Sequence, residues 1–68
     1  MGKYIIISDK KNIELVERIS FNLKNCNKQY LRLEKLYWYG YLAALKDKKN
    51  IIYSDYTKII NFIEEFKL

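Results

Sequence analysis

Apolar residues recur at helical spacing in three stretches of the chain. In the first stretch, over about 10–25, they are three and four residues apart and would share one helix face: Leu15, Val16, Ile19 and Leu23, followed by Cys26. Ser8 and Asp9 precede this stretch, and their side-chain oxygens can accept hydrogen bonds from the free N–H groups at a helix start. The pattern predicts a helix over about 10–25 with its N-terminal cap at Ser8 or Asp9.

The second stretch, over about 28–47, is apolar on most of its circumference. A helix over these residues would carry an apolar arc of about 260°, whereas a surface helix needs a stripe little wider than about 100°. Two nearly opposite sectors make up this arc. One sector contains Leu33, Leu36, Tyr37, Gly40, Ala43 and Ala44, and the other contains Leu31, Trp38, Leu42 and Leu45.

The sector around Gly40 is interpreted as a packing face. Glycine in a helix interior costs about 1 kcal/mol relative to alanine, so we expect a neighbouring helix to approach the backbone there. The sector around Trp38 then needs a cover of its own. Either the other two helices wrap both sides of this helix, or the Trp38 side meets a partner protein or a second copy of the chain.

The third stretch follows a polar loop over 47–50, in which Asn50 is expected to take a left-handed cap conformation. Ser54 and Asp55 are a second N-cap signal, and the apolar residues beyond them form one face of a helix that runs almost to residue 68: Tyr56, Ile59, Ile60, Phe62, Ile63 and Phe66. Residues 4–7 and 51–53 are β-branched or aromatic, which favours short strands that pair as a two-stranded ribbon, although either segment could instead extend the following helix backwards. We therefore expect one small, mainly α domain over 1–68, with elements in the order β-α-α-β-α.

A narrow third sector of the helix over 28–47 is basic. It contains one tyrosine among positive charges: Lys28, Arg32, Lys35, Tyr39 and Lys46. This stripe could bind phosphate or carboxylate groups with Tyr39 as a stacking contact, or it could be a solvated face. Phe21 is a second irregularity, because it projects opposite the apolar face of the first helix. Phe21 is either covered by the N-terminal segment or exposed as a partner contact.

Composition excludes most catalytic chemistry. The 68 residues include no His and one Cys, so neither a His-dependent catalytic triad nor a zinc site built from His or several thiolates can form. Gly2 and Gly40 are the only glycines, which excludes a glycine-rich phosphate loop. We expect no cofactor and no enzymatic activity. The apolar runs are too short for a membrane span, and the free thiol at Cys26 indicates a cytoplasmic setting.

The chain is basic, with 13 Lys and Arg against 8 Asp and Glu and a net charge of +5. The positive charge belongs to the first two-thirds of the chain. Such a balance attracts phosphate backbones or acidic protein surfaces, although it also simply keeps a small domain from self-associating. It argues against a DNA mimic, which would be acidic.

In size, in its richness in Lys, Ile, Asn and Tyr, and in lacking a catalytic motif, the chain resembles the small orphan proteins of phages and mobile elements, among them the anti-CRISPR proteins. The resemblance implies an inhibitor that acts by binding a host-defence protein or ribonucleoprotein complex in a bacterial cytoplasm. The expected partner-binding residues come from the basic stripe and the two irregular aromatics, together with Trp38: Phe21, Lys28, Arg32, Lys35, Trp38, Tyr39 and Lys46. The alternative is a small basic module that binds nucleic acid directly.

Overall fold

The computed structural model describes residues 7–67, which form three α-helices and one short 3₁₀ turn. In chain order these are α1 (Lys10–Asn25), η1 (Lys28–Tyr30), α2 (Leu31–Asp47) and α3 (Tyr53–Glu65). The predicted mainly α fold with three helices is confirmed. The helix predicted over 28–47 begins with the separate turn η1, and the last helix ends at Glu65 rather than close to residue 68.

The predicted β ribbon is wrong, because the part of the chain that the structure describes contains no strand. Residues 4–6 of the first proposed strand lie outside the described residues. In the second, Ile51 packs into the core with 8% of its surface exposed and Tyr53 already begins α3. Residues 51–53 therefore form no strand, because Ile51 is buried in the core and Tyr53 belongs to α3.

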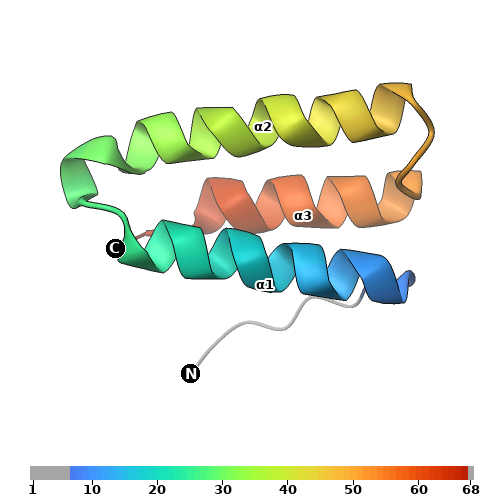
Figure 1. The fold of residues 1–68 in the computed structure, drawn as a ribbon, viewed down its shortest axis with the longest axis horizontal. Coiled ribbons are helices and arrows are strands. Elements are labelled where there is room, and N and C mark those ends of the chain that lie inside the picture. The colour runs from blue at the N-terminus through green and yellow to red at the C-terminus, as the bar shows by residue number, and fades with distance from the viewer. Residues whose placement is uncertain (1–6, 68) are drawn as a thin grey trace.

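The three helices lie side by side, and α2 runs opposite to α1 and α3 (Figure 1). α2 packs against both of the other helices. The core is formed by side chains from all three helices and from the loop before α3: Leu15, Ile19, Leu23, Trp38, Leu42, Ile51, Ile59 and Ile63. The apolar faces predicted for α1 and α3 therefore meet the Trp38 side of α2.

The start of α1 is capped twice. Asp9 is the N-cap residue, and its Oδ1 accepts a hydrogen bond from Lys11 N at 3.0 Å, which confirms the predicted cap. The second cap comes from α3. The buried carboxylate of Asp55 accepts from Ser8 N at 2.9 Å, from Asp9 N at 3.0 Å and from Asn12 Nδ2 at 2.9 Å.

The prediction that Ser54 or Asp55 caps its own helix is wrong. The N-cap of α3 is Ile52, whose side chain makes no capping bond, and Asp55 lies in the first turn of the helix. Burial would by itself raise the pKa of the Asp55 carboxyl. The hydrogen bonds from Ser8, Asn12 and Asp9, with the charge of Lys58, nevertheless hold that pKa below its ordinary value of 3.8.

α2 ends in a Schellman motif. Asn50 N donates to Leu45 O at 2.8 Å, and Lys49 N donates to Lys46 O at 3.0 Å. The left-handed residue is Lys49, with φ of 59°, and not Asn50 as predicted. Asp47 is the last residue of α2, and the connection to α3 runs over residues 48–52, with Ile51 buried in the core.

We predict that Asp55→Ala lowers the free energy of unfolding by about 2–4 kcal/mol, since it leaves two backbone N–H groups and a buried amide without their acceptor. Asp9→Ala, the matched control at the exposed cap, is expected to cost about 1 kcal/mol. Urea unfolding followed by circular dichroism measures both. Equal losses in the two variants would contradict a dominant role for Asp55.

The lowered pKa of Asp55 also predicts a dependence on pH. A carboxyl whose pKa is lower in the folded chain than in the unfolded chain stabilises the fold above its ordinary value of 3.8. That stabilisation disappears as the pH falls through the folded-state pKa. The difference in unfolding free energy between the natural protein and Asp55→Asn should therefore be largest at neutral pH and shrink in strongly acidic solution. A difference that does not change with pH would contradict the assignment.

Candidate protein-binding surface

The outward side of α2 is a continuous apolar surface. We define the outer face of α2 as Leu33, Leu36, Tyr37, Gly40, Tyr41 and Ala44, all of which are exposed. The exposed fractions are 62% for Leu33, 53% for Leu36 and 59% for Tyr37. Single exposed apolar residues are ordinary, but a contiguous group on one face marks an interaction site. This surface is the strongest candidate site on the described residues.

Only one of the two apolar sectors of α2 is buried. The sector around Trp38 is the core, and the sector around Gly40 faces outward. The prediction that another helix of this chain packs closely against Gly40 is wrong. A Cβ atom built on Gly40 would have no contact within 4 Å from the described residues. The larger side chains fill the core because they bury more apolar area.

Trp38 was expected among the partner contacts, but it is 1% exposed and lies in the core. Its Nε1 donates to Glu34 Oε2 at 3.2 Å, and the Arg18 guanidinium lies 5.8 Å from its ring centroid. Tyr37 and Tyr41 meet the indole edge-on at centroid distances of 5.0 and 5.4 Å. Trp38 therefore does not contact a partner itself but supports two tyrosines of the outer face.

A shallow groove between α1 and α2 continues the apolar surface. Side chains from both helices and from η1 line it: Arg18, Asn22, Tyr30, Leu33, Glu34, Tyr37 and Trp38. On the other side of Arg18, a second depression on α1 is lined by Phe21 with Glu14 and Glu17. The sequence left open whether Phe21 is covered or exposed, and in the structure 66% of its surface is exposed. It therefore lies close to the groove.

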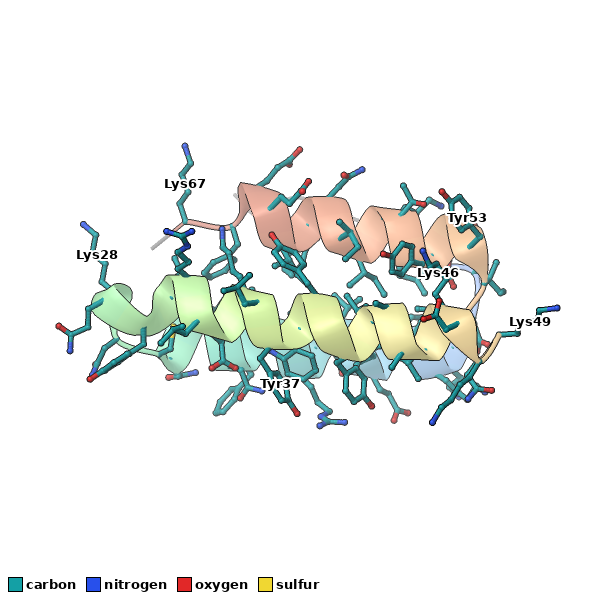
Figure 2. All side chains as sticks on the ribbon, turned by 90° about the horizontal axis from the view of Figure 1, so that it is seen from above. Lys28, Tyr37, Lys46, Lys49, Tyr53 and Lys67 are labelled. Atoms are coloured by element: carbon teal, nitrogen blue, oxygen red, sulfur yellow. The ribbon has the colours of Figure 1, made fainter. Side chains whose placement is uncertain are left out.

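Two of the four basic residues in the stripe, Lys35 and Lys46, make contacts within the chain. Lys35 Nζ donates to Glu64 O at 3.3 Å and to Phe66 O at 2.7 Å, at the end of α3. Lys46 Nζ lies 4.8 Å from the centroid of the Tyr56 ring. Figure 2 shows Lys46 on the α3 side of α2 and Tyr37 on the opposite side. Lys35 and Lys46 thus stabilise the contact between α2 and α3.

Tyr39 is half-buried and packs against the core. Burial and the nearby charge of Glu64 raise the pKa of its phenol. Lys28 and Arg32 are exposed, and Figure 2 shows Lys28 projecting from the end of the bundle. Of the expected partner-binding residues, Phe21, Lys28, Arg32 and Lys46 are exposed, but the structure does not assemble them into one cluster with the others.

Sequence reasoning placed Leu33, Leu36 and Tyr37 inside the fold and did not consider Tyr41 or Tyr30 as contacts. The signal that would have found them is residue size. The Trp38 sector contains only large side chains, whereas the Gly40 sector contains one glycine and two alanines. Burying the Trp38 sector removes more apolar area from water and therefore stabilises a small bundle more than burying the Gly40 sector would.

Three other features that can indicate function are a metal site, a membrane-spanning helix and a reactive thiol. Among residues 7–67, no group of three or more His, Cys, Asp or Glu side chains is placed to hold a metal ion. None of the described helices is long and apolar enough to cross a membrane. Cys26 is a free, half-buried thiol, and its Sγ donates to Leu23 O at 3.4 Å.

Comparison with protein-family models, with curated proteins and with solved structures finds no match to this chain.

The position of Lys35 predicts a structural role. Lys35→Met should lower the free energy of unfolding by about 1 kcal/mol, because two carbonyl groups at the end of α3 lose a charged donor. Lys28→Met is the matched control and should change it by less than about 0.5 kcal/mol. Urea unfolding measures both. If Lys35→Met is as stable as Lys28→Met, the contact does not stabilise the fold.

Proposed function

We propose that this protein is a non-enzymatic binding protein that recognises an amphipathic helix of a protein partner through the outer face of α2. The observation that carries the proposal is the exposure of Leu33, Leu36 and Tyr37, each by more than half of its surface. These side chains would bury apolar area on binding, at about 25 cal/mol per Å² before the costs of association.

The shape of the surface favours a helix as its occupant. The outer face is one straight strip from Leu33 to Ala44, which at 1.5 Å per residue is about 17 Å long. A helix lies along such a strip with residues at positions i, i+3, i+4 and i+7 as anchors. The described residues contain no strand and so offer no sheet edge on which a partner strand could be added.

Nucleic acid fits this surface less well. Phosphate contacts need free cations, and the outer face has no charged residue between Leu33 and Ala44. Lys35 and Lys46, half of the basic residues in the proposed stripe, are engaged at the α2–α3 contact. Direct binding of nucleic acid remains the alternative and is one outcome of the experiment below. That the protein partner belongs to a host-defence complex, and that binding inhibits it, stay predictions from the resemblance to phage orphan proteins.

A photo-crosslinking residue in place of Tyr37 tests the proposal. Irradiation in a host lysate should give an adduct with a protein chain that persists after nuclease treatment and decreases when unlabelled protein is added in excess. Adding Leu36→Glu to the same chain should abolish the adduct, because a carboxylate would be buried without a partner.

The matched control carries the same crosslinker at Asn61, which is exposed on α3 away from the outer face. It should give no specific adduct. An adduct at Tyr37 that disappears with nuclease would favour the nucleic-acid module. Absence of any competable adduct at Tyr37 would overturn the proposed function.

A further inference from the structure

We infer that the helix seated on the outer face of α2 is the α2 helix of a second copy of this chain, in an antiparallel two-fold pair that crosses at Gly40. The inference rests on the proposed function and specifies its partner. Three properties of the face support it. Large and small side chains lie on opposite sides of Gly40, opposite charges lie at the two ends of the face, and no other helix of the chain packs against Gly40.

Large and small side chains lie on opposite sides of Gly40. Leu36 and Tyr37 lie four and three residues before it, and Ala43 and Ala44 lie three and four residues after it. In an antiparallel pair related by a two-fold axis at Gly40, each residue meets a residue that lies about as far on the other side of Gly40 and projects on the same side of the face. At 100° per residue, Leu36 of one copy then faces Ala43 of the other, and Tyr37 faces Ala44. Large side chains meet small ones, which a self-complementary interface requires.

The two charges that border the face obey the same symmetry. Arg32 lies eight residues before Gly40 and Asp47 lies seven residues after it, and both are exposed. At 100° per residue they project on the same side of the face. The two-fold axis therefore brings Arg32 of one copy beside Asp47 of the other, and does so twice. A parallel pair would instead set Arg32 against Arg32 and Tyr37 against Tyr37.

The crossing angle follows from the reach of these side chains. The charged residues lie about 11 Å along the helix from the crossing point. At a shallow crossing of about 20°, the two helix axes are displaced sideways from each other by about 4 Å at that distance, which an arginine side chain spans. At about 50° this displacement is more than twice as large. The pair is therefore expected to cross at the shallow angle typical of helical bundles.

Gly40 allows the axes to approach. Apart from the neighbouring residues and the backbone of α2 itself, no described part of the chain comes within 4 Å of a Cβ placed there, so no packing contact of the described residues explains a glycine that costs about 1 kcal/mol in a helix. A second helix crossing at this point explains it, because the missing side chain lets two backbones pack closely.

Sedimentation equilibrium across a range of protein concentrations tests the inference, with circular dichroism as the check on folding. We expect a reversible monomer–dimer equilibrium. Gly40→Leu should raise the melting temperature of the monomer, because leucine is the better helix former, and should weaken the dimer at least tenfold. That combination separates loss of the interface from loss of the fold.

Charge reversal tests the antiparallel register. Arg32→Asp and Asp47→Arg should each weaken the dimer about three- to tenfold, because two attractive contacts become repulsive. The double variant should restore the natural affinity. Neither substitution is expected to destabilise α2, because the helix dipole favours an acid in the first turn and a base in the last turn. Lys67→Asp, which makes the same change of net charge as Arg32→Asp but lies beyond α3, is the matched control for that variant and should have no such effect (Figure 2).

A monomer at every concentration would overturn the inference. A dimer that Gly40→Leu does not weaken, or one that the double charge reversal does not restore, would overturn it as well. The proposed function fails separately: a monomeric chain whose Tyr37 crosslinks to a different protein keeps the proposed function while refuting the second copy. A Tyr37 adduct of twice the chain mass supports both.

Discussion

The fold depends on one buried carboxylate placed where two helices begin. α1 and α3 run in the same direction, so their N-termini, each a partial positive charge, lie at the same end of the bundle (Figure 1). Asp55 sits in the first turn of α3 and accepts from Ser8, Asp9 and Asn12 at the start of α1. One negative charge thus offsets both helix ends and satisfies two backbone donors that directly precede α1. Residues more than 40 positions apart in the chain are joined by this contact.

The opposite end of α3 is stabilised by the opposite charge. Lys35 of α2 donates to the carbonyl groups of Glu64 and Phe66, where the helix dipole is negative. A cation at the end and an anion at the start of α3 hold it against its two neighbours. This use of Lys35 explains why a stripe that resembles a phosphate-binding surface in sequence is, in three dimensions, partly internal. Charge that stabilises the bundle is not available to a partner.

The same packing creates the outer face of α2. Two neighbouring helices can cover only one side of a third, and in this bundle they cover the side with Trp38 and Leu42. Leu33, Leu36 and Tyr37 therefore face solvent. Leucine on a solvated helix face buries little apolar area, whereas leucine on a face that binds another helix buries more. The apolar strip, its central glycine and its flanking Arg32 and Asp47 have one consistent explanation as a contact between helices.

The sequence by itself determined the three helices, the cap at Asp9 and the face of α1 that enters the core, because these depend on spacing and on neighbours in the chain. It also indicated that the second helix is more apolar than its fold requires. Only the tertiary structure decided which of its two sectors is buried, because periodicity separates faces without saying which one meets the core. The structure likewise assigned Asp55 to another helix and Lys35 to a distant C-terminus. Both contacts join residues that are far apart in the sequence, and the local pattern of residues cannot predict such contacts.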